Sequence, residues 1–203
     1  TYMHELNSLW FIQWNSNNIS GAIPSELGLM PTASFMYLAN NALSGTIPTE
    51  IGMGGDWAVL LLNGNALTGT LPTELGLLTR LIDLQLQKND FSGTLPTEIF
   101  LLTNLNTLKL DADLMPTVPT ELDLLTALTD FDLVGEVGEN VTGFPMDIFN
   151  GTTDFINELD FTDQLLTGSL PSELGLLTNL IALKISNNQF TGTIPTELGR
   201  CTN

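Results

Sequence analysis

Apolar and polar positions follow one another along this chain in a pattern that repeats about every 24 residues. The clearest copy runs from Leu81 to Asn104 and reads L-x-x-L-x-L-x-x-N-x-F-S-G-T-L-P-T-E-I-x-x-L-T-N. Self-similarity at such a period is typical of a solenoid, in which each repeat forms one coil and packs only on its neighbours. We therefore expect residues 1–203 to form a single elongated domain.

The leading apolar residue of each copy sets the register of eight repeats, with successive spacings of 24, 24, 24, 24, 23, 28 and 24 residues. These leading residues are Leu9, Ala33, Trp57, Leu81, Leu105, Leu128, Ile156 and Leu180. The fifth and sixth repeats are thus irregular, and we expect a bulging loop from Gly135 to Thr142.

The L-x-L segment of each repeat alternates inward and outward positions, as a β-strand does. Stacking these segments predicts a parallel sheet on the concave side of the solenoid, with helix limited to short turns after the E-L-G segments. We expect the strands to centre on Ile12, Met36, Leu60, Leu84, Leu108, Phe131, Leu159 and Leu183. An internal ladder that satisfies backbone groups is predicted for Asn17, Asn41, Asn65, Asn89 and Asn188.

A more specific string, L-[ST]-G-x-[IL]-P-x-E-[LI]-G, occurs at Leu43 to Gly52, Leu67 to Gly76 and Leu166 to Gly175. It resembles the plant-specific class of leucine-rich repeat, found in receptor-kinase ectodomains and polygalacturonase-inhibiting proteins. The resemblance covers essentially the whole chain. It implies an α/β solenoid, a right-handed arc with a parallel concave β-sheet and little helix, that recognises a protein, a peptide or a polysaccharide.

Both ends of the chain lie inside a repeat, so we expect a fragment of a longer protein that lacks its caps. Cys201 is the one cysteine and stands in a core column. One interpretation is a buried core thiol. The other is a disulfide to a C-terminal cap, because members of the resembled class carry paired cysteines in their caps.

The charge of the chain limits its partners. A net charge of −18, from 23 acidic and five basic residues, argues against nucleic acid and anionic membranes and allows a cationic partner. Apolar runs such as Ala58 to Leu62 are too short to span a bilayer, so this segment is not expected to insert into a membrane. The single histidine, His4, cannot build a catalytic triad or a histidine metal site. We therefore expect no enzyme activity and no cofactor.

Function should lie in the outward positions of the concave sheet, which the fold does not dictate. In the first three repeats these positions, apart from Gln13, are apolar: Phe11, Phe35, Tyr37, Val59 and Leu61. Exposed aromatic clusters usually mark binding surfaces, so we expect partner binding or self-association here. Coverage by an N-terminal cap is the alternative.

Most of the outward positions in the later repeats are polar or charged, beginning with Asp83, Gln85 and Lys109. Four carboxylates follow, at Asp130, Asp132, Glu158 and Asp160, with no basic residue in their own two repeats. A solvated acidic face, a site for a Lys/Arg-rich partner and a calcium site all remain open, although no calcium-loop motif is present. Mutual repulsion should raise the carboxyl pKa values, so mild acid or calcium should stabilise the fold.

Two further features bear on function. Threonine columns resemble the arrays of ice-binding solenoids; they are Thr46, Thr70, Thr94, Thr117 and Thr193, and Thr49, Thr73, Thr97, Thr120 and Thr196. Glycosylation sequons at Asn18, Asn140 and Asn150 favour a secreted, extracellular or cell-surface protein. The leading hypothesis is a non-catalytic recognition module that binds on its concave face. An ice-binding protein and a structural subunit of a larger assembly are the alternatives.

Overall fold

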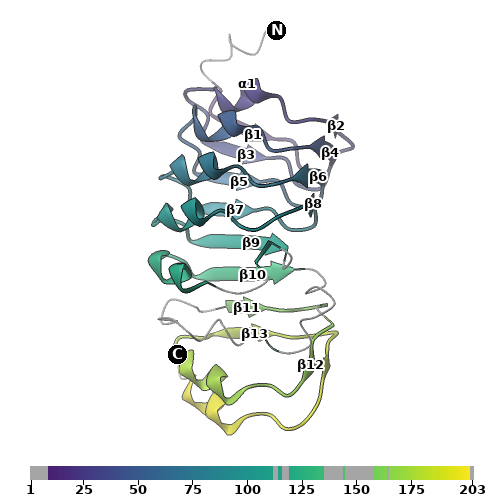
Figure 1. Cartoon of the computed structure of the whole chain (residues 1–203), viewed down its shortest axis with the longest axis vertical. Coiled ribbons are helices and arrows are strands. Elements are labelled where there is room, and N and C mark those ends of the chain that lie inside the picture. Colours follow the sequence, from purple (N-terminus) through teal and green to yellow (C-terminus); the bar gives the residue numbers. More distant parts are fainter. Residues whose placement is uncertain are drawn as a thin grey trace.

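The main feature of the computed structural model is one parallel sheet of eight strands, with a strand from each coil (Figure 1). The structure describes residues 9–111, 114–115, 119–134, 144, 158–163 and 165–201. The strands, in spatial order, are β1 (Phe11–Gln13), β3 (Phe35–Tyr37), β5 (Val59–Leu61), β7 (Asp83–Gln85), β9 (Thr107–Asp111), β10 (Asp130–Val134), β11 (Glu158–Asp160) and β13 (Ala182–Lys184). Each contains the residue expected at its centre, so the predicted sheet is confirmed.

The strands pair in register, so equivalent residues of successive coils lie side by side. Phe11 pairs with Phe35, and Phe35 pairs with Val59. The same register holds across the irregular coils, where Asp130 pairs with Thr107 on one side and Glu158 on the other. The differences in repeat length are therefore accommodated outside the sheet. The loop expected from Gly135 to Thr142 lies outside the described residues.

A second set of strands, which the sequence pattern did not predict, pairs on another side of the coils. One sheet contains β2 (Ser20–Gly21), β4 (Ala42–Gly45), β6 (Ala66–Gly69) and β8 (Asp90–Phe91), and a separate pair contains β12 (Thr167–Gly168) and β14 (Gln189–Phe190). These segments are two to four residues long. The sequence pattern assigned one strand to each coil, at the L-x-L segment, and so left these segments without a strand.

Short helical turns face the viewer along one flank (Figure 1). They are α1 (Ser25–Gly28) and the 3-10 turns η2 (Thr49–Gly52), η3 (Thr73–Leu77), η4 (Thr97–Leu101), η6 (Thr120–Leu124), η8 (Ser172–Leu176) and η9 (Thr196–Arg200). The expectation that they follow the E-L-G segments is wrong, because they begin directly after the prolines. A proline lacks an N–H but its carbonyl can accept, and the Ile51 N–H donates to Pro48 O at 3.1 Å.

The predicted asparagine ladder is confirmed at four of its five positions. The Asn65 amide donates to Leu62 O of its own coil (2.8 Å) and to Leu38 O of the preceding coil (3.1 Å). Its Oδ1 accepts from the Leu43 N–H at 3.1 Å. Equivalent sets of bonds are made by Asn41, Asn89 and Asn188. Asn17 donates instead to Trp14 O and Asn15 O of its own coil.

Leucines and a few larger side chains fill the space between these layers. Trp57, Leu60 and Leu84 are fully buried. Cys201 packs half-buried against this core, is a free thiol, and has its Sγ 3.6 Å from Leu174 O.

Within the described part of the chain, no helix is long and apolar enough to cross a bilayer.

Glycines at the end of the E-L-G segments allow the turns of adjacent coils to stack closely. A Cβ added at Gly76 would lie 2.5 Å from both Cβ and O of Glu98 in the next coil, which is far inside van der Waals contact. The same conflict would arise at Gly28, Gly52 and Gly175. At Gly199, which has the same local sequence in the last described coil, an added Cβ would meet nothing within 4 Å.

Replacing Gly76 by Ala should therefore destabilise the fold by about 1–3 kcal/mol, because the next coil must move to relieve the overlap. Gly199→Ala is the matched control and should be neutral or slightly stabilising, since alanine restricts the unfolded chain. Urea unfolding followed by circular dichroism measures both. Equal midpoints for the two variants would show that close stacking of the turns is not required.

Candidate functional site

The outward residues of the main sheet form two adjacent columns, which we call the concave columns. In the first, Phe35, Val59 and Asp83 lie side by side, and in the second, Tyr37, Leu61 and Gln85 do so. The predicted site residues are thus brought onto one surface. Strands hold this surface, so the positions of its side chains are set by the sheet register.

Aromatic rings gather at one end of the concave columns. Phe11 lies 5.3 Å from Tyr37 and 6.0 Å from Phe35, measured between ring centroids, and Phe35 and Tyr37 are parallel. Trp10, which the sequence analysis missed, is 5.7 Å from Phe11 and meets Phe35 edge-on at 5.8 Å. It precedes the strand, so strand alternation did not assign it to this face. We define the aromatic patch as Trp10, Phe11, Phe35, Tyr37, Val59 and Leu61.

The aromatic patch is partly accessible to solvent. Trp10 is 59% exposed and Phe11 37%, whereas Phe35 and Tyr37 are half-buried against their neighbours. Large apolar side chains that are fixed on strands and still reach solvent are available for contact with a partner. The patch has the composition of a binding surface.

Asp83 and Gln85 occupy the middle of the concave columns. The Gln85 Nε2 donates to Asp83 Oδ1 at 3.1 Å. Burial raises the pKa of Asp83, the Gln85 hydrogen bond opposes this, and the charge of Asp130 adds to the rise while Lys109 lowers it. This pair separates the aromatic patch from the charged end of the face.

Lysines from adjacent coils flank the acidic coils. The Lys109 ammonium is 3.0 Å from Asp130 Oδ2, and the Lys184 ammonium is 3.6 Å from Asp160 Oδ2. Both ion pairs join an acidic repeat to a neighbouring one, so the sequence of the two acidic repeats alone did not predict them. Glu158 pairs with Asp130 in the sheet, but its side chain is outside the described part of the structure.

Asp132 lies between these ion pairs and is 8% exposed, with no hydrogen-bond partner for its Oδ1. Burial raises its pKa to about 7; the charges of Asp160 and Asp130 add to the rise, and Lys109 and Lys184 oppose it. The expected rise in pKa is therefore confirmed at Asp132, although burial is a larger cause than repulsion.

For Asp160 the expected rise is wrong. Burial acts in the raising direction, but hydrogen bonds from Thr162, including one from its N–H at 3.0 Å, and the Lys184 charge lower the pKa below its usual value. Among the described residues, no group of three His, Cys, Asp or Glu side chains is arranged to hold a metal ion.

Two buried amide oxygens were also missed by the sequence analysis. Asn63 Oδ1 and Gln87 Oε1 follow β5 and β7 by two residues and have no hydrogen-bond donor within the described structure. Repetition of a polar residue two positions after the strand was the available signal. Buried acceptors without donors are uncommon, so their presence beside the concave columns identifies polar groups that the chain itself leaves unsatisfied.

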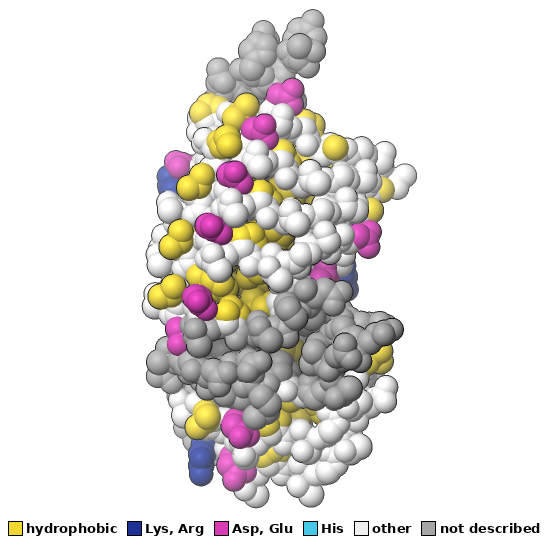
Figure 2. Space-filling view, viewed as in Figure 1, with side chains coloured by type: hydrophobic (Ala, Val, Ile, Leu, Met, Phe, Trp, Pro, Cys, Tyr) yellow, Lys and Arg dark blue, Asp and Glu magenta, His cyan; other side chains and the backbone are white. Residues whose placement is uncertain are grey.

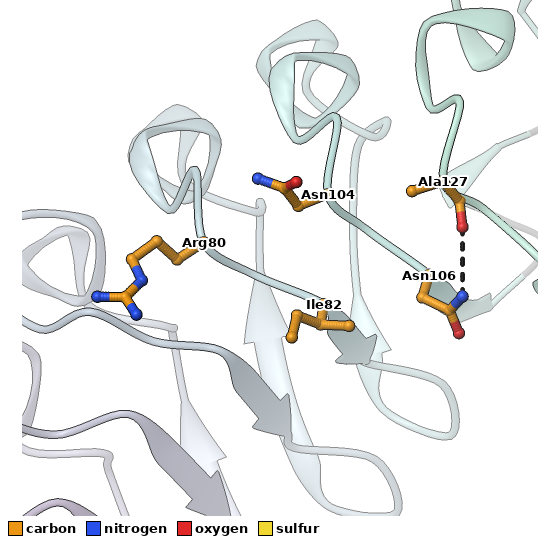
Figure 3. Close-up of a pocket in the computed structure, with 5 residues that line it drawn as sticks. All are labelled: Arg80, Ile82, Asn104, Asn106 and Ala127. Atoms are coloured by element: carbon orange, nitrogen blue, oxygen red, sulfur yellow. Dashed lines mark hydrogen bonds between the residues drawn. The ribbon is translucent and has the colours of Figure 1, made fainter.

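A shallow hollow of about 370 Å³ adjoins the concave columns where the strands begin, lined by Arg80, Ile82, Asn104, Asn106 and Ala127 (Figure 3). Asn106 Nδ2 donates to Ala127 O at 3.3 Å, and the Arg80 guanidinium pairs with Asp56 at 2.7 Å. None of the predicted site residues lines this hollow. Three successive coils contribute to it, so no single repeat carried its signature.

The threonine columns are exposed wherever the structure describes them, at Thr46, Thr70, Thr94, Thr193, Thr49, Thr73, Thr97 and Thr196. Hydroxyls of the second column donate to the adjacent glutamates, at 3.4 Å for Thr73 and Glu74 and 3.2 Å for Thr196 and Glu197. Thr117 and the Thr120 side chain lie outside the described residues, and the ice-binding hypothesis stays a prediction.

Of the sequons, Asn18 is exposed, whereas Asn140 and Asn150 are not described.

Several solved structures resemble this chain. A TDR receptor is 29% identical, with 97% of this chain and 34% of that chain covered and a TM-score of 0.74. A second similar structure is the leucine-rich-repeat ectodomain of the Arabidopsis receptor kinase HAESA in complex with an IDA peptide hormone ligand. It is 28% identical to this chain, the match covers 97% of this chain and 33% of the HAESA chain, and the TM-score is 0.70. A leucine-rich-repeat protein of Leptospira interrogans is 30% identical, the match covers 98% of this chain and 54% of the Leptospira chain, and the TM-score is 0.69.

The family described as Leucine Rich Repeat matches residues 179–201. No curated protein matches the chain in sequence. The chain spans about a third of the TDR receptor and HAESA chains that it resembles, 34% and 33% respectively.

Lowering the pH from 8 to 5 should raise the free energy of unfolding by a few kcal/mol. The pKa of Asp132 in the folded protein, about 7, is higher than its pKa in the unfolded chain. Ionisation of this carboxyl above pH 7 therefore destabilises the fold. This cost disappears as the pH falls towards the unfolded pKa. The Asp160 contribution, from a lowered pKa, is lost only below that range.

Asp132→Asn should be clearly more stable than the parent at pH 8, by a smaller margin at pH 5, and nearly independent of pH between them. Asp90→Asn, at an exposed strand position, is the control and should keep the parent's response. Thermal unfolding at each pH measures the effect. A parent-like pH response of Asp132→Asn would refute the assignment of the response to this buried carboxyl.

Proposed function

We propose that this chain, a leucine-rich-repeat solenoid of the plant type, is a non-catalytic recognition module that binds a peptide or protein segment across its concave columns. The observation that carries the proposal is the aromatic patch. It places aromatic rings within 5.3 to 6.5 Å of one another on a face that the fold leaves open.

The order of the rings in the patch lowers the entropy cost of binding. Association loses less entropy when the contacting side chains are already ordered, and the rings of the patch are held by strands and by one another. Aromatic side chains in such settings contribute most of the binding energy of many interfaces. An extended ligand segment could place an apolar or aromatic side chain on this patch.

The other half of the concave columns favours a cationic group on the same ligand. Asp130 and Asp160 are held in ion pairs with lysines, whereas Asp132 Oδ1 has no hydrogen-bond partner among the described residues. A ligand that is apolar at one end and cationic at the other therefore complements the face from β1 to β11. Asp83, Gln85 and Lys109 would contact the middle of such a ligand.

The similar structures support a peptide ligand and an extracellular setting. The HAESA structures contain a peptide hormone, in one case with the co-receptor SERK1, and the receptor RGFR1 is bound to RGF2. Those ligands are known for those proteins; for this chain the peptide class and cell-surface location are part of the proposal. Glycosylation at Asn18, which is exposed, would be consistent with that location.

The test of the proposal is a selection of peptides from a random displayed library on the parent protein, followed by affinity measurements. Replacing Phe35 and Tyr37 by Ala should weaken the selected peptides by roughly 2 kcal/mol or more, about 30-fold in Kd, because the patch loses two anchors. Ile194→Ala removes an apolar side chain that is 77% exposed and not part of the patch, and should leave affinity unchanged.

Both variants should unfold near the parent's melting temperature, which separates lost contacts from lost structure. Peptides that bind the Phe35 and Tyr37 variant as tightly as the parent would contradict the proposal.

A further inference from the structure

A ridge of exposed apolar side chains runs along the flank that carries the helical turns. Its members stand at the same position of successive coils and are each between 51% and 63% exposed. We define the turn ridge as Leu29, Met53, Leu77, Leu101, Leu124 and Leu176. Single exposed leucines are ordinary on protein surfaces, but here they recur at one position of neighbouring coils and so form a row.

The sequence repeat accounts for this row. In E-L-G-L-L, the leucine before the glycine and the last leucine point into the core, as Leu75 and Leu78 do, whereas Leu77 between them points out. Core packing therefore requires the outer two apolar positions and not the middle one. In the last coil Arg200 takes the middle position, which shows that the fold accepts a charged residue there.

A column of glutamates runs beside the turn ridge, three residues earlier in each coil: Glu26, Glu50, Glu74, Glu98, Glu121, Glu173 and Glu197. Figure 2 shows acidic side chains recurring down this flank beside hydrophobic ones. Within the described structure, no ion pair engages Glu26, Glu50, Glu74 or Glu98. The ridge is thus apolar with an acidic border.

We propose that the turn ridge is a docking surface for a basic amphipathic α-helix of another protein. Neighbouring coils are about 4.8 Å apart at the strands, and an α-helix advances about 5.4 Å per turn. A helix lying along the ridge therefore sets about one apolar side chain per turn against each coil, with lysines or arginines over the glutamates. The five consecutive coils from Leu29 to Leu124 span about 19 Å, the length of about 13 helical residues.

The negative charge of the ridge border favours a cationic helix over a second copy of this chain or an anionic lipid surface. A second copy of the chain would bring together two glutamate columns on molecules of net charge −18. An anionic lipid surface meets the same repulsion. A cationic helix is the occupant that both the apolar row and its acidic border fit. The proposal concerns a different face from the concave columns and does not depend on their function.

The probe is a labelled, amidated 14-residue peptide of leucine and lysine, with leucines spaced to form one helical face, titrated with the parent and followed by fluorescence anisotropy. It should bind, become helical on binding, and bind less tightly at higher salt. The same peptide with glutamate in place of lysine should not bind. Failure of the lysine peptide to bind the parent would overturn the proposal.

Variants locate the site. Leu77→Gln with Leu101→Gln should weaken the lysine peptide at least tenfold, and Glu74→Gln with Glu98→Gln should weaken it about threefold or more and reduce the salt dependence. Matched controls off the ridge are Ile194→Gln for the apolar change and Asp90→Asn for the charge; both should bind like the parent. Because the changed side chains are exposed or polar, all variants should keep the parent's circular dichroism spectrum.

Parent-like binding by the ridge variants, or an equal loss in the controls, would overturn the proposal in favour of non-specific charge attraction. Sedimentation velocity without peptide tests the remaining occupant. The parent should be monomeric at the concentrations used for binding. A parent dimer that Leu77→Gln with Leu101→Gln converts to monomer would assign the ridge to a second copy instead.

Discussion

Each coil of this solenoid depends on polar groups supplied by the next, and the asparagine ladder makes that dependence explicit. Asn65 joins the carbonyl groups of two coils and accepts an N–H of the earlier one, all inside the molecule. A buried backbone group without a partner costs about 1–3 kcal/mol, so a coil separated from its neighbours could not keep this turn. The ladder, together with the parallel sheet, fixes both the direction and the spacing of the coils.

That fixed spacing converts a linear repeat into surface columns, and the columns carry the chemistry. Residues one period apart in sequence become neighbours across strands, so Phe11 meets Phe35 and Asp132 lies beside Asp160. Rings then form a patch and carboxylates shift their pKa values. The fold itself leaves the outward positions free, so the same architecture holds an aromatic and a charged half on one face.

The sequence was sufficient for the strands and for the asparagine ladder, whose signals lie within one repeat. The strand around Leu84 and the role of Asn89 followed from alternation and from a single buried polar position, and the structure confirms both. The helical turns were placed a few residues too late, because the proline carbonyl that starts each turn was not considered as an acceptor.

Features that arise between repeats were missed or misjudged. The second set of strands was missed because only one strand was assigned to each coil. Lys109 and Lys184 neutralise acids of neighbouring coils, so counting charges within two repeats predicted repulsion where Asp160 has an ion pair. Trp10 meets Phe35 of the next coil in the aromatic patch, and Arg80 lines the hollow together with residues of other coils, so neither role was predicted. Predicting these contacts requires the register of several coils at once.

The central claim is that ligands bind on the concave columns through the aromatic patch. It is tested most directly by attaching a spin label to a peptide selected on the parent and measuring paramagnetic broadening of the methyl resonances of the protein. The account predicts strong broadening at Val59 and Leu61 and little at Leu77 and Leu101 on the opposite flank. Broadening at Leu77 and Leu101 with sharp Val59 and Leu61 signals would contradict it.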